Sequence, residues 1–147
     1  MEMANHVTIV MVEDDPGHAA LIEKNLRRGG IYNPIKKIDN GRVALEYLCS
    51  KKECDPKSDA GPILVLLDLN LPEVDGFEIL EAMKSNPYTK CIPIIILTTT
   101  DNPAEIDRAY KLGCNVYVAK PLDYERFAEA IRKLGLMLSV VELPHRE

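Results

Sequence analysis

The chain has 147 residues, of which 46% are hydrophobic and 28% charged, a composition typical of one soluble globular domain. Its formal net charge of -5 argues against nucleic-acid binding, which needs a basic surface. The sequence contains no apolar run near the roughly 20 residues of a membrane span, and its first residues lack the basic and apolar regions of a signal peptide. We therefore expect a cytoplasmic protein that binds neither nucleic acid nor a membrane.

The first half of the chain alternates between predicted strands and helices. Val7–Val12 is rich in β-branched residues, which favour a buried strand. Asp15 and Pro16 supply an N-cap and a first-turn proline for a helix that ends at Gly29-Gly30. Residues 35–38 form a weaker second strand, and Asn40-Gly41 begins a second helix.

The second half continues this alternation after a polar loop at residues 50–62. Ile63–Leu67 is apolar at every position, as expected for a strand that helices cover on both faces. The remaining predicted elements are a helix at 76–84, a strand at 93–97, a helix from 102 to 113, a strand at 116–119 and a final helix from Asp123. Five strand–helix pairs predict an α/β fold with a doubly wound, five-stranded parallel sheet. We expect one domain, with its core at about 7–141 and a tail at 142–147.

The cysteines do not predict a metal site. None of Cys49, Cys54, Cys91 and Cys114 forms a CxxC pair, so neither a zinc site nor a disulfide framework is expected. We expect reduced thiols at these positions.

Charged and hydroxyl residues stand at the carboxyl ends of the predicted strands, where open α/β sheets bind ligands. Glu13 and Asp14 follow the first strand, Asp68 the third, Thr98 the fourth and Lys120 the fifth. Three carboxylates in one crevice would repel each other, and a divalent cation would relieve that repulsion. Oxygen ligands without histidine or cysteine favour Mg²⁺ over zinc.

Such a site suits the transfer of a phosphoryl group. A carboxylate beside Mg²⁺ and Lys120 is a competent phosphoryl acceptor, because the two cations neutralise the developing charge. Each residue also has a structural reading: Glu13-Asp14 as partners of a helix dipole, Asp68 as a turn former, Thr98 as a strand residue. The presence of the whole set at one sheet edge favours the functional reading.

These residues resemble the receiver domain of two-component response regulators, over roughly Val7 to Val141. The matching motifs are Glu13-Asp14, Asp68-Leu69-Asn70-Leu71-Pro72 followed by Asp75-Gly76, then Thr98, and finally Lys120-Pro121. The resemblance implies a flavodoxin-like fold and a role in phosphorelay signal transduction. In the family, the residue at Asp68 accepts a phosphoryl group from a phosphohistidine on a sensor histidine kinase.

The resemblance implies a set of ligands around that acceptor. Asp14 and Asp68 would bind Mg²⁺ directly, together with the backbone carbonyl of Asn70, and Mn²⁺ could substitute. Glu13 would act mainly through metal-bound water. Lys120 would contact a phosphoryl oxygen. The protein would be a signalling switch and not an enzyme, beyond Mg²⁺-dependent self-phosphorylation and slow autodephosphorylation.

The resemblance also implies how the switch works. Thr98 would move toward the phosphoryl group and Tyr117 would swing inward behind it. The surface formed by the helix from 102, the strand at 116–119 and the final helix would change as a result. Asn70 and Thr100 occupy positions that tune loss of the phosphoryl group in the family, and Thr99 would partly restrict access to Asp68.

Within the family, the chain looks most like the response regulators of cyanobacterial and bacterial phytochromes. The similar features are the long loop at 50–62, the run Pro62–Pro72, Thr98-Thr99-Thr100 and an extended C-terminal helix. That likeness implies a phytochrome kinase as partner and a homodimer formed through the strand at 116–119 and the final helix. Four apolar residues off the core stripe of that helix support a dimer: Leu136, Met137, Val140 and Leu143. The alternative is that this end packs back on its own domain.

Three other functions are consistent with parts of this pattern. A nucleotide-binding domain would place a glycine-rich loop after the first strand, where this chain has Glu13-Asp14-Asp15-Pro16. A haloacid-dehalogenase-like phosphatase generally needs a second acid two residues after its nucleophile, where this chain has Asn70. A receiver-fold scaffold that is not phosphorylated would have no need of the intact acid, threonine and lysine set.

Overall fold

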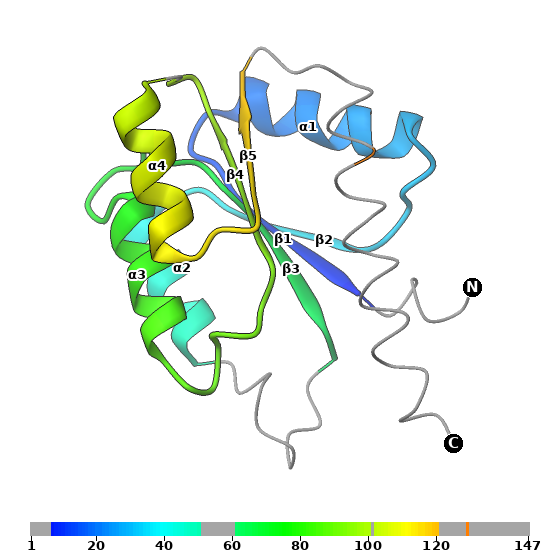
Figure 1. The fold of residues 1–147 in the computed structure, drawn as a ribbon. Coiled ribbons are helices and arrows are strands. Elements are labelled where there is room, and N and C mark those ends of the chain that lie inside the picture. Colours follow the sequence, from blue (N-terminus) through cyan, green and yellow to red (C-terminus); the bar gives the residue numbers. More distant parts are fainter. Residues whose placement is uncertain (1–6, 51–60, 101, 121–128, 130–147) are drawn as a thin grey trace.

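The computed structural model describes residues 7–50, 61–100, 102–120 and 129, and it contains one five-stranded parallel sheet of order β2-β1-β3-β4-β5 (Figure 1). The strands are β1 (Thr8–Val12), β2 (Ile35–Ile38), β3 (Ile63–Leu67), β4 (Ile94–Thr98) and β5 (Val116–Ala119). The helices are α1 (Pro16–Arg28), α2 (Gly41–Cys49), α3 (Gly76–Ser85) and α4 (Pro103–Leu112). The predicted doubly wound α/β fold is confirmed.

Part of the prediction falls outside the described residues. Of the final helix expected from Asp123, only Glu129 is described, and it is helical and exposed. The candidate dimer residues Leu136, Met137, Val140 and Leu143 and the tail at 142–147 lie in the same undescribed part of the chain. The dimer therefore stays a prediction.

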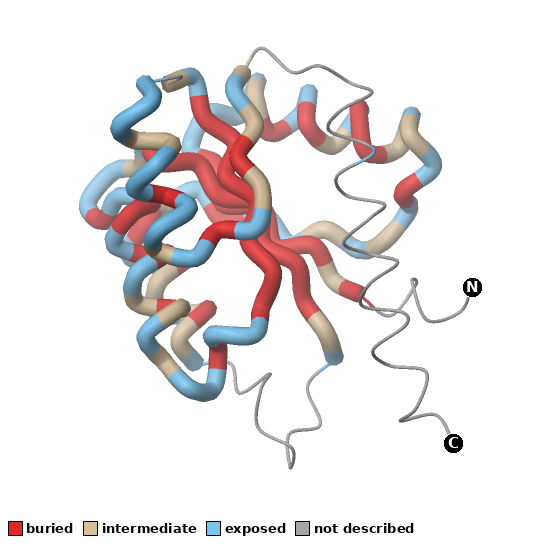
Figure 2. The backbone as a smooth tube through the Cα atoms, in the orientation of Figure 1, coloured by how far each residue is buried: buried red, intermediate tan, exposed pale blue. Residues whose placement is uncertain are grey.

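The sheet is covered on both faces by helices. Helix α1 packs on one face, and α2, α3 and α4 pack on the other (Figure 1). Alternate side chains of β3 pack on opposite faces of the sheet. Val65 belongs to the apolar cluster under α2 and α3, and Leu64 belongs to the cluster under α1. Every residue of β3 is buried, as Figure 2 shows for the sheet centre. No helix in the described part of the chain is long and apolar enough for a membrane span.

The helices begin at the sheet edge where the predicted site lies. The Asp15 carboxylate accepts hydrogen bonds from the backbone N–H groups of Gly17 and His18, which caps α1. Asn40 caps α2 in the same way, and Asp75 forms a capping box at the start of α3. These caps fix the loops that connect the strand ends to the helices.

Two glycines hold the loop after β3 by close backbone contact. A Cβ atom on Gly41 would lie 1.8 Å from the carbonyl oxygen of Val74, and one on Gly76 would lie 2.4 Å from that of Asp68. Both distances are far below van der Waals contact, so neither position has room for a side chain. The loop that carries Asp68 is consequently packed against the first residues of α2 and α3.

Within that loop, Glu73 has a left-handed backbone with a φ of 68°. The N–H of Val74 donates to the carbonyl of Pro72 at 2.8 Å, which makes Glu73 the centre of a γ-turn of the strained, positive-φ kind. The Glu73 carboxylate accepts hydrogen bonds from Asn40 Nδ2 at 2.7 Å and Arg42 Nε at 3.3 Å. Both hydrogen bonds lower the pKa of Glu73, and the bond from Asn40 has the larger effect. They also connect the turn to the start of α2.

The cysteines differ from the expectation. Cys49 and Cys114 are free, but Cys91 is disulfide-bonded, so the prediction of reduced thiols was wrong at Cys91. Sequence spacing does not reveal which thiols approach each other in space, and that approach decides disulfide formation. Cys54 lies outside the described residues. Burial raises the pKa of Cys114 to about 11, which makes this thiol a poor nucleophile.

Candidate functional site

Three carboxylates meet at the carboxyl ends of two neighbouring strands. Glu13 and Asp14 follow β1 and Asp68 follows β3, and the parallel register pairs Val12 with Leu67 just before them. One oxygen from each carboxylate lies within 4.8 Å of the others. Glu13 and Asp68 are buried, and Asp14 is exposed. The structure therefore brings the predicted acids into one crevice.

The electrostatics of this cluster suit a divalent cation. Burial raises the pKa of Glu13, the hydrogen bond from Lys120 opposes that rise, and the charge of Asp68 adds to it. Ionised oxygens at this separation repel one another in a partly buried site. Three hard oxygen donors, with no nitrogen or sulfur among them, fit Mg²⁺ or Mn²⁺.

Lys120 brings the positive charge from the other side of the site. Its Nζ atom lies 2.5 Å from Glu13 Oε1 and 3.5 Å from Asp68 Oδ2, and only 7% of its side chain is exposed. Its backbone N–H donates to the carbonyl of Thr98 at 2.7 Å, which holds the end of β5 against the end of β4. The lysine is thus directed at the two buried acids.

A hydroxyl group completes the crevice. Thr98 is the last residue of β4, whereas the sequence predicted it just after the strand. The residue is fully buried. Its Oγ1 accepts a hydrogen bond from Asn70 Nδ2 at 3.3 Å, and the Asn70 backbone N–H donates to Asp68 Oδ1 at 3.2 Å. Asn70 therefore connects the hydroxyl with the carboxylate.

Tyr117 lies inward in this structure. The side chain is buried, and its hydroxyl donates to the carbonyl of Thr100 at 2.8 Å. Thr100 is half-buried and Thr99 is exposed. The tyrosine on β5 therefore contacts the segment that follows β4.

The structure adds one residue that the sequence did not single out. His18 Nδ1, in the first turn of α1, lies 3.2 Å from Lys120 Nζ and 3.9 Å from Glu13 Oε2. The two residues are 102 positions apart, so spacing gave no indication of this contact. The available signal was the place of His18 three residues after the capping Asp15, at the same edge of the sheet.

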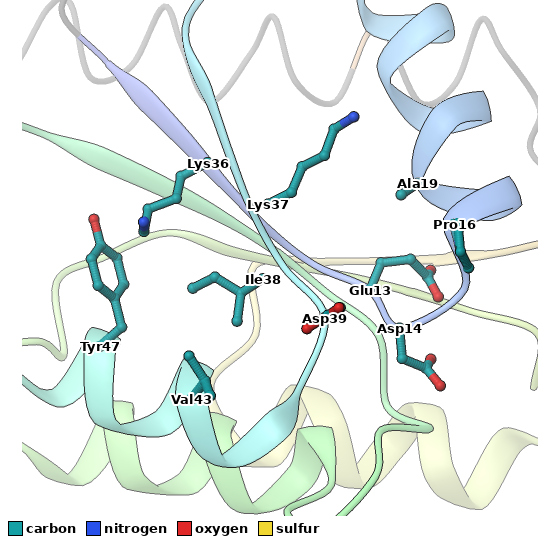
Figure 3. A pocket seen from close by; sticks show the side chains of 10 residues that line it. All are labelled: Glu13, Asp14, Pro16, Ala19, Lys36, Lys37, Ile38, Asp39, Val43 and Tyr47. Atoms are coloured by element: carbon teal, nitrogen blue, oxygen red, sulfur yellow. The ribbon is translucent and has the colours of Figure 1, made fainter.

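Two open cavities lie beside Glu13 and Asp14. One of about 480 Å³ runs along the outer edge of β2 and has Glu13 and Asp14 at one end (Figure 3). Lys36 lies at its other end, 4.9 Å from the centre of the Tyr47 ring. The second, of about 620 Å³, lies over the loop after β3 and is lined in part by Asp14, Asn70 and Arg108. A bound group could therefore approach Glu13 and Asp14 from solvent.

Residues 9–132 match the response regulator receiver domain family, and the chain belongs to this family. The match includes every acid of the crevice. It also includes all the described strands except Thr8, the first residue of β1. The protein is thus a receiver-domain response regulator of two-component signalling.

Several relatives resemble the chain over most of its length. A receiver domain structure from Rhodospirillum rubrum is 51% identical, covers 90% of this chain and 94% of that chain, and has a TM-score of 0.72. Response regulator Rcp1 of Synechocystis sp. is 31% identical over 92% of both chains. A structure of its Mn²⁺-bound form covers 92% of this chain and 91% of that chain at 30% identity, with a TM-score of 0.66. The phosphorylated cyanobacterial phytochrome response regulator RcpA is 31% identical, covers 93% and 91%, and has a TM-score of 0.68.

Proposed function

We propose that the chain accepts a phosphoryl group on Asp68 from a phosphohistidine of a sensor histidine kinase, in a reaction that depends on Mg²⁺. A carboxylate oxygen of Asp68 would form a bond to phosphorus while the bond from phosphorus to the kinase imidazole nitrogen breaks. The observation that carries the proposal is the position of Asp68, which lies beside two other carboxylates and 3.5 Å from Lys120 Nζ.

The residues around Asp68 would hold the cation. Asp14 and Asp68 would be direct ligands, with the backbone carbonyl of Asn70, and Glu13 would bind through water. Mg²⁺ supplies positive charge that offsets the charge of the phosphoryl oxygens. Mn²⁺ could substitute, which is supported by the Mn²⁺-bound form of Rcp1.

Lys120 and Thr98 would change their contacts when Asp68 is phosphorylated. Lys120 would turn from Glu13 toward a phosphoryl oxygen, since three charged oxygens would then lie near its ammonium group. Thr98 would exchange its hydrogen bond with Asn70 for one to the phosphoryl group. The resemblance implies that Tyr117 swings inward; since its side chain is already buried and bonded to the Thr100 carbonyl, it would keep this position. The surface of α4, β5 and the predicted final helix would change. Thr99, Thr100 and Asn70 would tune how fast the phosphoryl group is lost.

The proposed partners follow from the likeness to Rcp1 and RcpA. The kinase would be a phytochrome, which is supported by the description of RcpA as a cyanobacterial phytochrome response regulator. The chain would form a homodimer through β5 and the final helix. It would act in the cytoplasm, with residues 1–147 as one receiver domain. It would have no enzymatic activity beyond its own phosphorylation and dephosphorylation.

Incubation with acetyl phosphate and Mg²⁺ tests the acceptor. Intact-mass measurement should show one added phosphoryl group, and Asp68→Asn should show none. Glu81→Gln, an exposed change on α3, is the matched control and should be phosphorylated like the wild type. Addition that persists in Asp68→Asn would contradict the assignment, and the absence of any addition to the wild type would favour an unphosphorylated scaffold.

The alternative phosphatase function has a separate readout. Asn70 cannot act as a proton shuttle, so phosphate release from small phosphomonoesters should not exceed the stoichiometric amount. Multiple turnovers would favour the haloacid-dehalogenase-like reading.

Phosphotransfer from a panel of phytochrome and other histidine kinases tests the partner. The fastest transfer should come from a phytochrome. Sedimentation at two protein concentrations tests the dimer, and a monomer at the higher concentration would contradict it.

A further inference from the structure

The ammonium group of Lys120 has an acceptor that the proposed phosphoryl chemistry does not use. An ammonium group has three N–H donors and no acceptor. Two of its neighbours are the carboxylates of Glu13 and Asp68, and the third is His18 Nδ1, at 3.2 Å. Both the lysine and the glutamate are nearly buried, whereas 42% of the His18 side chain is exposed.

This contact determines which nitrogen of His18 carries the hydrogen. Because Lys120 Nζ can only donate, Nδ1 must present its lone pair to make a favourable contact at this distance. The imidazole hydrogen is then on Nε2. The carboxylate oxygens nearest to Nδ1, Glu13 Oε2 and Asp15 Oδ2, are both 3.9 Å away, which is too far to accept a hydrogen bond from it.

We propose that His18 is a positioning residue that holds the Lys120 ammonium group between Glu13 and Asp68 for phosphoryl transfer. The proposal rests on the function proposed for Asp68 and adds a residue to it. A lysine side chain has many rotamers. Each acceptor that holds the ammonium group before the reaction lowers the conformational entropy that must be lost to reach the reactive rotamer. Asp68 lies 3.5 Å from Nζ, so only a small movement separates Lys120 from the reacting oxygens.

The position of His18 in the helix supports a role at the site. It occupies the first turn of α1, and its backbone N–H donates to the capping Asp15 at 3.1 Å, which fixes where the side chain begins. An imidazole contributes no special helix stability at this position. Its partial exposure means that a substitution leaves the apolar core of α1, at Ala19, Ile22 and Leu26, intact.

Two substitutions separate the acceptor from the bulk of the ring. His18→Leu keeps the volume, favours the helix and removes the acceptor. His18→Asn places a carbonyl oxygen close to where Nδ1 stands. With acetyl phosphate and Mg²⁺, His18→Leu should lower the rate constant of phosphorylation about three- to tenfold, the value of one hydrogen bond, and His18→Asn should restore it to within about twofold.

Lys24→Ala, an exposed change six residues further along α1, is the control and should leave the rate unchanged. An unchanged rate in His18→Leu would overturn the proposal. An equally low rate in His18→Asn and His18→Leu would also overturn it, because the hydrogen-bond acceptor at position 18 would then not determine the rate of phosphorylation.

Nitrogen NMR of the imidazole tests the contact without any phosphoryl transfer. At alkaline pH, where an imidazole is neutral, the His18 resonances, assigned by their loss in His18→Asn, should report hydrogen on Nε2. Hydrogen on Nδ1 would overturn the proposal. If the wild type accepts no phosphoryl group, the proposed function of Asp68 fails, while this measurement still decides whether His18 accepts from Lys120.

Discussion

The loop after β3 and the segment after β4 both border the site, but they are held by different kinds of contact. The first packs backbone against backbone at Gly41 and Gly76 and contains the strained turn at Glu73. The second is held by single hydrogen bonds, from Tyr117 to Thr100 and within the cap of α4. Steric contacts of the first kind give way only when the backbone moves, whereas a hydrogen bond can be exchanged for another.

This difference fits the tasks that we propose for the two regions. Asp68 has to stay at a fixed distance from the cation ligands, and its loop is the one packed backbone against backbone at Gly41 and Gly76. Thr98 and the residues after it have to respond to a new charge, and their contacts can be exchanged at low cost. Substitutions in the two regions should therefore differ in their effects.

The largest effect is expected from Gly41→Ala. The new methyl group would overlap the carbonyl of Val74, so either α2 or the loop has to shift, and the free energy of unfolding should fall by about 3 kcal/mol or more. Urea denaturation measures it. Gly30→Ala is the matched control, because Gly30 has a φ of 87° but open space around it, and only the backbone cost of about 1 kcal/mol applies there. Equal losses in the two variants would contradict the steric account.

The next effect concerns the cation. Mg²⁺ at 100 times its dissociation constant should stabilise the wild type by about 2.7 kcal/mol, because it binds only the folded site. Asp14→Asn removes one of the three carboxylates and should lose most of that gain, while Glu81→Gln should keep it. Thermal unfolding with and without Mg²⁺ measures the difference. Equal stabilisation of Asp14→Asn would place the cation elsewhere.

A smaller effect is expected at the strained turn. Glu73→Ala and Glu73→Gly both remove the carboxylate, but only glycine adopts the left-handed backbone without strain. Glu73→Gly should therefore be more stable than Glu73→Ala by about 1 kcal/mol. The reverse order would show that the turn carries no strain.

The same carboxylate gives a pH dependence. Asn40 and Arg42 lower the pKa of Glu73 in the fold, so its contribution to stability is present above its ordinary value of 4.5 and is lost as the pH falls through the lower folded value. The difference in stability between the wild type and Glu73→Gln should shrink over that acidic range. A difference that grows toward low pH would contradict this assignment.

The smallest effect is expected from Tyr117→Phe, which removes the hydrogen bond to the Thr100 carbonyl. The free energy of unfolding should fall by about 0.5 kcal/mol. Amide hydrogen exchange should become faster at Thr99 and Thr100 and stay unchanged from Leu69 to Val74. Equal acceleration in both segments would remove the contrast between them.

The fold and the acids were predictable because they follow from simple rules. Apolar runs such as Ile63–Leu67 indicate strands buried on both faces, and alternation with helices makes the sheet parallel. All carboxyl ends of a parallel sheet share one edge, so Glu13, Asp14 and Asp68 were expected at the same edge, and the pairing of β1 with β3 brings them together.

The remaining features depend on loop conformation and side-chain direction, which no residue pattern encodes. A glutamate at positive φ is rare, and nothing around Glu73 in the sequence indicates it. Asn40-Gly41 was read as a helix start, which it is, but the close approach of Val74 appears only in the structure. The contact of His18 with Lys120 joins residues from opposite ends of the chain.

Anomalous scattering from a crystal of the wild type soaked in Mn²⁺ shows directly whether the three acids share a cation. We expect one strong peak within about 2.5 Å of oxygens from both Asp14 and Asp68, because a divalent ion binds hard oxygens at such distances. A peak that lies elsewhere, or no peak in that crevice at saturating Mn²⁺, would contradict the claim that these acids share a cation.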